Sequence, residues 1–312
     1  MVSVEKVRAE QISEVVSLLD NTRFGNLSAP AWQNLFSYHW QGRDEPYGYV
    51  LLDGSKVVGF HGAIFSRRVI DERVEKFCHL AAWYVESNYR DNSLLLLRPF
   101  MRLSGYTLLD LTPRREVALL LKRLGFKELD TQLRILLSPS IALRSVASHR
   151  EQCLVTHDEK MVEHALTSRD REIIDDHKPY GCFHVFAVIG NRCCHVVYTT
   201  PCVWKMRHCY IHYLSDPDMF LKCYEVILAQ ILSHTRSLVG IVDSRLVLGM
   251  KLPASFNYPV RATKLYKSSG LKPEQIDNLY SELILLNSST LYGAGVFVRQ
   301  LKETVFHAKA RT

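Results

Sequence analysis

The stretch from Trp83 to Leu137, with the few residues before it, decides how this chain folds. It begins with an extended apolar run, LAAWYV at 80–85, and a polar turn, ESNYRDNS at 86–93. A leucine-rich segment with the character of a helix follows at 94–103, and then a second apolar run, YTLLDL, at 106–111. A helix ending in LLLKRLGF at 119–126 and a strand from Gln132 to Leu137 complete the stretch. This order of strand, turn, helix and strand predicts an α/β unit.

The residues before this stretch supply the earlier elements of the same unit. Alternating apolar residues predict a strand at 2–8, and helical spacing of apolar residues predicts helices at 9–20 and 29–40. Strands are predicted at 47–53 and 56–65, on either side of Asp53-Gly54, a strong hairpin signal. A junction of strand, turn and helix, such as the one near residue 90, offers backbone N–H groups and a helix dipole to a phosphate.

In their order and in their sequence motifs, these elements resemble the GNAT acyltransferase superfamily over roughly the first 140 residues. The resemblance implies that the turn holds the pyrophosphate of acetyl-coenzyme A, or another acyl-coenzyme A, as co-substrate. Leu-Gly-Phe at 124–126 is similar to a late signature of that family. The family's phosphate motif, R/Q-x-x-G-x-G, falls on Arg90 to Leu95, so the resemblance assigns cofactor binding to Val85, Arg90, Asp91, Asn92, Ser93, Leu94 and Leu95.

The sequence departs from the family pattern at three positions. Ser93 and Leu95 stand where the motif has glycines, which let the backbone approach a phosphate closely. Leu121 stands where the family often has a tyrosine general acid. Pro99 also interrupts the segment expected to be helical.

Length, composition and charge restrict the classes of protein to which this chain can belong. The 312 residues suffice for two domains, and 47% hydrophobic with 23% charged residues is typical of a packed globular chain. No apolar run approaches the roughly 20 residues that span a bilayer, and the N-terminus has no signal-peptide core, so we expect a cytoplasmic protein without a membrane partner. The net charge of +7 is scattered along the chain, which does not favour nucleic-acid binding.

The second half repeats the first in outline. Two strands flank Gly190-Asn191, a long helix begins at Pro217 and ends near Thr235, and apolar strands are expected at 238–242 and 283–286. The corresponding turn, Ser215 to Asp218, carries two carboxylates, which would repel a phosphate. With a linker at 138–150, we expect two tandem GNAT-like α/β (α+β) domains, each a mixed, strongly twisted sheet flanked by helices. Residues 1–140 would bind acyl-coenzyme A, and 150–312 would be a degenerate copy without a cofactor site.

The resemblance implies transfer of an acyl group, most simply acetyl, to a primary amine of a small metabolite, an amino sugar or a peptide. A base must remove a proton from that amine. The candidates are His79, on the strand that leads to the phosphate turn, His61, on the neighbouring strand, and Glu86, at the strand end. His79, Ala81 and Trp83 should face the same way. Core packing for the two histidines and a simple turn position for Glu86 are the alternative interpretations.

Other interpretations remain open at this point. Tyr84 and Tyr106 could act as acids in place of Leu121. The lost glycines also fit a GNAT-derived binding module without catalysis. A third possibility is an acyl-carrier protein as donor, bound by a patch of Arg67, Arg68, Arg114 and Arg115.

Cysteine and histidine residues crowd the second half, at 182–212. No pair of cysteines has the spacing of a zinc finger, so we expect no metal site. The chain has eight cysteines and no secretory signal, so we expect free, mostly buried thiols.

Overall fold

A computed structural model of the chain describes residues 2–22, 27, 29–42, 44–138 and 153–310, and it divides them into two compact units. Unit 1 consists of Met1–Glu128, Lys264–Gln275 and Tyr280–Leu286, and unit 2 consists of Leu129–Thr263, Ile276–Leu279 and Asn287–Thr312. The expected domains 1–140 and 150–312 were continuous, whereas unit 1 includes two segments from the C-terminal part of the chain. Nearly all of the expected linker, 138–150, lies outside the described residues.

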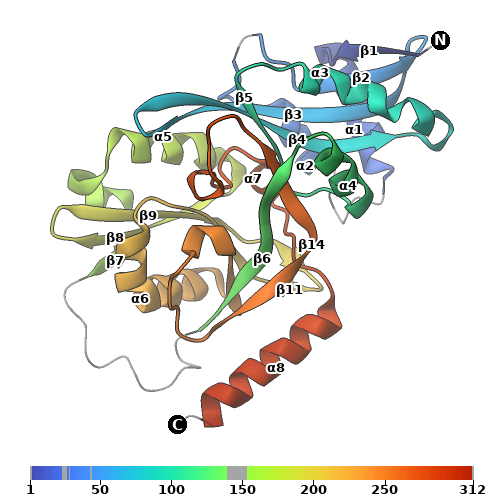
Figure 1. Ribbon diagram of the computed structural model, residues 1–312. Helices are drawn as coiled ribbons and strands as arrows, with labels where there is room; N and C mark the ends of the chain where they lie inside the picture. Colours follow the sequence, from blue (N-terminus) through green and yellow to red (C-terminus); the bar gives the residue numbers. More distant parts are fainter. Residues whose placement is uncertain (1, 23–26, 28, 43, 139–152, 311–312) are drawn as a thin grey trace. The chain divides into compact units, whose positions relative to one another are not determined.

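Unit 1 is a mixed sheet with helices against it (Figure 1). Its strand order is β1-β2-β3-β4-β5-β14, antiparallel except that β4 and β5 are parallel. The strands are β1 (Val2–Lys6), β2 (Gly48–Asp53), β3 (Lys56–Ile70), β4 (Arg73–Val85), β5 (Tyr106–Asp110) and the last residues of β14 (Ser255–Lys267). The α-helices are α1 (Ile12–Asp20), α2 (Ala29–Gln33), α3 (Arg98–Met101), α4 (Arg115–Arg123) and α7 (Glu282–Leu285). The 3₁₀ helices are Ala9–Gln11, Asn34–Phe36, Ser87–Leu96 and Pro273–Gln275.

The hairpin expected at Asp53-Gly54 is confirmed, because Asp53 pairs with Lys56 across it. The core on one face of this sheet joins the strands to α3 and α4 through Ala63, Leu80, Phe100 and Leu121, all of them buried. Leu121 is fully buried in that core, so an apolar residue there is explained by packing alone.

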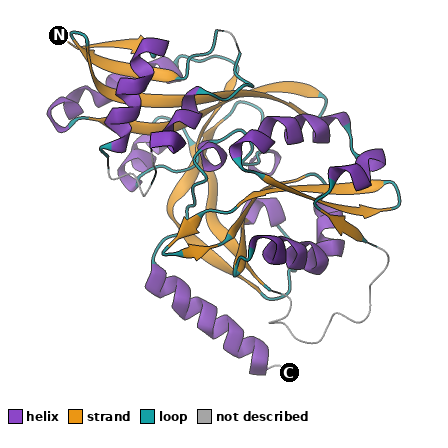
Figure 2. Ribbon diagram, turned by 180° about the vertical axis from the view of Figure 1, so that it is seen from behind, coloured by secondary structure: helices purple, strands orange, loops and turns teal. Residues whose placement is uncertain are grey.

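Unit 2 also combines sheet strands and helices (Figure 2). Its part of the sheet has the strand order β14-β6-β13-β12-β9-β8-β7. Its strands are β6 (Lys127–Leu137), β7 (Leu154–Thr156), β8 (Phe183–Ile189), β9 (Arg192–Thr199), β12 (Cys209–Leu214), β13 (Val239–Asp243) and the first part of β14, with β10 (Cys202–Val203) and β11 (Met206–Arg207) as a separate pair. Its helices are α5 (Ser168–His177), α6 (Pro217–Thr235) and α8 (Ala294–Ala310), and the 3₁₀ helices Glu159–Ala165, Lys178–Tyr180 and Ser244–Val247.

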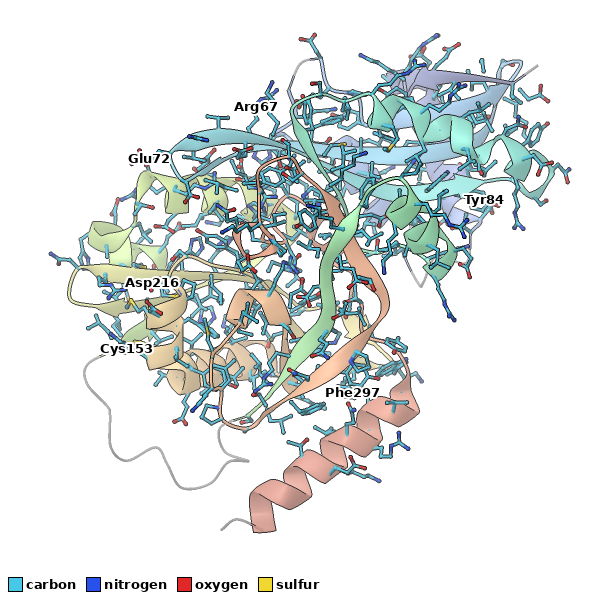
Figure 3. The ribbon with its side chains drawn as sticks, viewed as in Figure 1. Arg67, Glu72, Tyr84, Cys153, Asp216 and Phe297 are labelled. Atoms are coloured by element: carbon cyan, nitrogen blue, oxygen red, sulfur yellow. A yellow bond between two sulfur atoms is a disulfide. The ribbon has the colours of Figure 1, made fainter. Side chains whose placement is uncertain are left out.

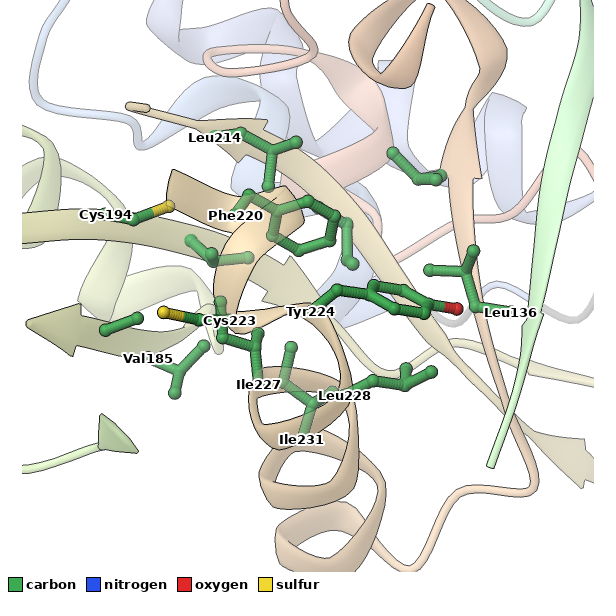
Figure 4. Packing of buried hydrophobic residues seen from close by; sticks show 14 of the residues in the cluster. Leu136, Val185, Cys194, Leu214, Phe220, Cys223, Tyr224, Ile227, Leu228 and Ile231 are labelled. Atoms are coloured by element: carbon green, nitrogen blue, oxygen red, sulfur yellow. The ribbon is translucent and has the colours of Figure 1, made fainter. Parts of the chain in front are cut away.

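The helix α6 supplies much of the core of unit 2. It runs from Pro217 to Thr235, as the sequence predicts, and Asp216 caps it by accepting a hydrogen bond from Met219 N at 2.9 Å. Its buried face, which includes Phe220, Ile227 and Ile231, packs on the strands (Figure 4). The hairpin at Gly190-Asn191 is also confirmed, with Ile189 paired to Arg192.

Four expectations about local structure are corrected. Residues 94–103 are not one helix: a 3₁₀ helix ends at Leu96, and α3 adds only Arg98–Met101 around Pro99. The helix expected at 29–40 stops at Phe36, as α2 and one 3₁₀ turn. The apolar run 283–286 is helical in α7, because a short apolar run does not distinguish a strand from a buried helix. Finally, Cys153 and Cys223 form a disulfide rather than two free thiols.

Among the described residues, no helix is both long enough and apolar enough to cross a membrane.

Candidate functional site

The strands β4 and β5 part before β4 ends. Their parallel pairing runs from Lys76 with Tyr106 to His79 with Leu109. The strand β5 ends one residue later, at Asp110, whereas β4 continues to Val85. In the described part of unit 1, no strand pairs with this last stretch of β4 on the β5 side. The two strands therefore form an opening at this end of the ladder.

A β-bulge lies in this same stretch of β4. Phe60 of β3 pairs with Tyr84, but Gly62 pairs with Ala81, so β4 has an extra residue opposite His61. Ala82 takes up the irregularity with a φ of 50°, a left-handed conformation that is uncommon for alanine. Bulges and strained backbone of this kind often re-aim groups at functional sites.

The bulge separates the two candidate histidines. His61 stacks on Trp83, with 4.6 Å between ring centroids, and lies edge-on to Phe100 at 4.8 Å. His79 pairs with Ile64, whose side chain lies on the opposite face from that of Ala63. The expectation that His79 and Trp83 share a face is therefore wrong, because the bulge shifts the alternation between them.

Both histidines are buried, His61 at 1% exposure and His79 at 0%. Burial lowers the pKa of His61 to about 3, so its imidazole is neutral at pH 7. Its Nδ1 atom has no hydrogen-bond partner in the described part of the chain. An imidazole with so low a pKa is a weak proton acceptor near neutrality.

The remaining candidate acids and bases lie apart from the histidines. Glu86 forms an ion pair with Lys56, with 3.1 Å between Oε1 and Nζ, at the outer end of β4. Tyr106 donates to Glu45 at 2.9 Å, and burial, followed by that hydrogen bond, raises the pKa of its phenol to about 12. Tyr84 lies near the end of β4, far from the hairpin end that Arg67 and Glu72 mark (Figure 3).

The expected phosphate-binding residues form a 3₁₀ helix, Ser87–Leu96, rather than an open turn. In such a helix each N–H group donates to the carbonyl group three residues earlier. Tyr89 N donates to Glu86 O at 2.9 Å, and Leu97 N donates to Leu94 O at 3.2 Å. The N–H groups of Asp91 to Leu95 are thus used inside the helix, while the side chain of Arg90 is exposed.

Two buried carboxylates lie where β5 ends. Asp110 is the last residue of β5, and Glu282 is the first of α7; they are 7% and 2% exposed. Thr112 joins them, because its hydroxyl donates to Glu282 Oε1 at 3.0 Å and its N–H donates to Asp110 Oδ1 at 3.3 Å. The sequence analysis missed both residues. The available signal was a single carboxylate inside each of two apolar runs, Leu108 to Leu111 and Glu282 to Leu286.

A cavity of about 300 Å³ lies elsewhere in unit 1, lined by Glu45, Arg67, Tyr49 and Tyr106 among others. Arg67 and Tyr106 flank the first pair of the β4–β5 ladder, so this cavity lies at the end opposite to the parting of the strands. Arg67 is paired with Glu45 at 2.7 Å. Arg68 is 2% exposed and packs over Phe77, with 3.8 Å from Cζ to the ring centroid, so it cannot belong to a surface patch for a carrier protein.

Several histidines of unit 2 are hydrogen bonded in separate groups. His195 contacts Asp170 at 3.0 Å and His184 at 2.9 Å, while His212 contacts Thr199 and His208 contacts Ser289. Within the described ranges, no three His, Cys, Asp or Glu side chains gather in a way that could hold a metal ion.

Comparisons with known proteins bear on this arrangement. No protein-family model matches the sequence, and no curated protein is significantly similar to it. A GCN5-related N-acetyltransferase from Kribbella flavida has a similar structure, with a TM-score of 0.55 and 15% identity over 85% of this chain and 70% of that one. Another GCN5-related N-acetyltransferase, from Anabaena variabilis, gives a TM-score of 0.50 and 10% identity over 86% and 71% of the two chains.

The glucosamine N-acetyltransferase region of a fungal multi-domain β-N-acetylglucosaminidase is similar as well. Its TM-score is 0.56, with 13% identity, and the alignment covers 85% of this chain and 38% of that one. At such identities the likeness concerns the fold alone. This chain has the GCN5-related N-acetyltransferase (GNAT) fold, a mixed α/β architecture, as the sequence analysis expected.

Proposed function

We propose that unit 1 is an acyl-coenzyme A-dependent N-acyltransferase, with its co-substrate in the opening between β4 and β5. The observation that carries this proposal is the parting of the two strands beyond His79 and Leu109, in a chain with the GNAT fold. An extended pantetheine arm can lie along the last residues of β4, on the side that β5 leaves, as an added strand would. The bulge at Ala82 turns a backbone N–H away from the ladder, where it could bind the thioester oxygen.

The pyrophosphate would lie at the outer end of β4. We assign it to Val85, Arg90, Asp91, Asn92, Ser93, Leu94 and Leu95, as the motif predicts. Because the 3₁₀ helix uses the N–H groups of Asp91 to Leu95, we assign the main contacts to the Arg90 guanidinium and the Ser93 hydroxyl.

The acceptor would be a primary amine on a small metabolite, an amino sugar or a peptide, and we expect acetyl as the acyl group. His79, His61 and Glu86 stay candidates for proton transfer. Burial and the low pKa of His61 favour a packing role beside Trp83, so we expect His61→Ala to affect stability more than turnover. A cytoplasmic location is part of this proposal, since acyl-coenzyme A would be supplied there.

A GNAT-derived binding module is the second candidate, and one observation favours it. The 3₁₀ helix and the two missing glycines remove the backbone cradle that a phosphate turn provides. A module of this kind would bind a ligand in the opening between β4 and β5 without any turnover.

Calorimetry with acetyl-coenzyme A, followed by transfer assays on a panel of primary amines, tests the proposal. We expect micromolar binding and an acylated amine detectable by mass spectrometry. Ser93→Trp should weaken binding by blocking the phosphate, whereas Ser87→Trp, at the exposed start of the same helix, should not. Binding without transfer to any amine would favour the module. No heat with acetyl-coenzyme A, longer acyl-coenzyme A or acyl-carrier protein would overturn the proposal.

A further inference from the structure

The carboxylate pair of unit 1, Asp110 and Glu282, is incompletely hydrogen bonded. Glu282 Oε1 accepts from the Thr112 hydroxyl, but Glu282 Oε2 is buried and has no hydrogen-bond partner in the described part of the chain. Buried carboxylate oxygens are normally bonded, because an unpaired one costs its full desolvation energy. An exception of this kind requires an explanation, and a ligand that donates to Oε2 is one.

Unit 2 contains a carboxylate in the same structural context that is fully bonded. Asp243 ends β13, the parallel neighbour of β12, just as Asp110 ends β5, the parallel neighbour of β4. Tyr210 donates to Asp243 Oδ1 at 2.7 Å, and Asn278 donates to Oδ2 at 2.8 Å. Arg245 donates to Asp243 as well. This site needs no ligand to complete it, so burial at the end of a parallel strand does not by itself leave a carboxylate oxygen unpaired.

The position of the pair suits chemistry at the proposed thioester. Asp110 directly follows Leu109, which makes the last pairing between β5 and β4. The carboxylates therefore lie at the point where the two strands part. The backbone before Glu282 is also unusual, because Tyr280 has a φ of 60°. A left-handed tyrosine is strained, and backbone strain of this kind is common beside functional residues.

We propose that Glu282 Oε2 accepts the proton of the amine substrate during acyl transfer. In this step the amine nitrogen bonds to the thioester carbonyl carbon, the C–S bond breaks, and the bonding pair leaves on the coenzyme A sulfur. The amine proton passes to Glu282, which then returns a proton to the thiolate, so that amide and free thiol are formed. This inference rests on the proposed function, and it places the catalytic base of the acyl transfer on the segment that contains Glu282.

The surroundings of Glu282 suit the role. Burial raises its pKa to about 7, while the backbone N–H of Glu282 itself, the Thr112 hydroxyl, the charge of buried Lys264 and the backbone N–H of Leu111 act in the opposite direction. Burial, and then the neighbouring Glu282, raises the pKa of Asp110 well above its usual range. A base that titrates near the working pH is the efficient choice.

The test compares Glu282→Gln with Glu45→Gln in calorimetry and in turnover against pH. Glu45 is another shielded carboxylate of unit 1, but Arg67 and Tyr106 bond it. We expect Glu282→Gln to bind acetyl-coenzyme A as the parent does, to lose about 10²–10⁴-fold in kcat, and to lose the inflection near pH 7. Glu45→Gln should keep the inflection.

A second variant keeps the proposal testable if Glu282→Gln does not fold. Lys264→Gln removes a charge that lowers the pKa of Glu282, so the inflection should move to higher pH. Binding and full turnover by Glu282→Gln with an unchanged pH profile would overturn the assignment while leaving the proposed function intact. Failure of the parent chain to bind any acyl donor would instead overturn the proposed function and this inference with it.

Discussion

The two units have the same order of strand pairings, but they differ in how the aspartate at the end of the last strand is bonded. In unit 1, β2, β3 and β4 pair antiparallel in turn, the β3–β4 register shifts, and β4 pairs parallel with β5. In unit 2, β8, β9 and β12 pair antiparallel, the β9–β12 register shifts, and β12 pairs parallel with β13. Each run ends on a buried aspartate, bonded to Arg245 in unit 2 and placed beside Glu282 in unit 1.

This difference in hydrogen bonding indicates a structural polar cluster in unit 2 and a candidate site in unit 1. In unit 2 the Arg245 cluster, formed by Asp130, Tyr210, Asp243, Arg245 and Asn278, satisfies its charges internally. In unit 1 the pair Asp110 and Glu282 leaves one oxygen atom, Glu282 Oε2, without a hydrogen-bond partner among the described residues. Because an unpaired buried oxygen destabilises a fold, we infer that the unit 1 arrangement is kept for function.

The connections that follow β4 and β12 also differ, in the charge at their start. In unit 2, Asp216 caps α6 and pairs with Arg192, so a carboxylate already occupies the helix start. In unit 1 the crossover begins with the 3₁₀ helix and the exposed Arg90. We therefore keep the proposal that unit 2 is a degenerate GNAT-like copy without a cofactor site, and a structure with coenzyme A bound at Asp216 would refute it.

Among the changes that test this comparison of the two units, Arg245→Met should have the largest effect on stability. It would leave Asp243 and Asp130 buried without a countercharge, and we expect the free energy of unfolding to fall by about 3–5 kcal/mol. Urea denaturation measures this value. Arg134→Met is the matched control in unit 2: Arg134 donates to Ser255 and Asn257 in a more exposed position, so its loss should cost less than about 1 kcal/mol. Equal losses would show that the Arg245 cluster has no special structural weight.

A second effect is confined to unit 2, where Cys153 on the segment before β7 is joined to Cys223 on α6. Reduction, or Cys153→Ser, should lower the free energy of unfolding by about 2–4 kcal/mol. Cys202→Ser, which removes an exposed free thiol, should leave stability unchanged. Mass spectrometry after alkylation without reductant reports the bond directly, and modification of both Cys153 and Cys223 would contradict it. In a reducing compartment we expect this bond to be open.

The sequence predicted much of the framework because its signals were local. Asp53-Gly54 and Gly190-Asn191 each placed a hairpin, and Pro217 placed the start of α6, since turn and cap chemistry depends on neighbouring residues. The order of such elements, together with motifs such as Leu-Gly-Phe at 124–126, carried the resemblance to the GNAT superfamily.

What the sequence could not predict depends on distant residues. The bulge at Ala82 has no sequence signal, yet it decides that His61 contacts Trp83 while His79 faces the other side of the sheet. Cys153 and Cys223 are 70 residues apart, and Asp110 and Glu282 meet only because the C-terminal segment returns to unit 1. Contacts of this kind require the tertiary fold.

A smaller effect should appear at Glu282 itself, and its sign depends on pH. The pKa of Glu282 is raised from 4.5 to about 7 by burial, so between those values the folded chain holds a proton that the unfolded chain has lost. Stability therefore falls as pH rises through this window. Glu282→Gln lacks this term and should be more stable than the parent above pH 7, by about 1–3 kcal/mol. Thermal unfolding of both proteins at pH 5 and pH 8 measures the difference, and a Glu282→Gln variant less stable than the parent at pH 8 would count against a strained ionised Glu282.

The smallest effect per residue comes from buried neutral histidines, and it should distinguish the units. Burial lowers the pKa of His61 in unit 1 to about 3, and in unit 2 it lowers those of His157 and His208 to about 4 and of His184 to about 2. An unfolded histidine titrates near 6.5, so below that pH the unfolded chain binds protons that the folded chain does not.

Stability should therefore fall as pH falls below 6.5, by about 1.4 kcal/mol at pH 5.5 for each of the buried His61 and His208, and by less for His157 and His184, which are only partly buried. Three of the four histidines belong to unit 2, so unit 2 should lose protection first. Hydrogen exchange at pH 7 and 5.5, corrected for intrinsic rates, reports this unit by unit. His208→Gln should reduce the loss in unit 2 by about 1 kcal/mol, because glutamine can still bond Ser289 and cannot take up a proton. An equal loss of protection in both units would mean that these histidines do not set the acid stability of either one.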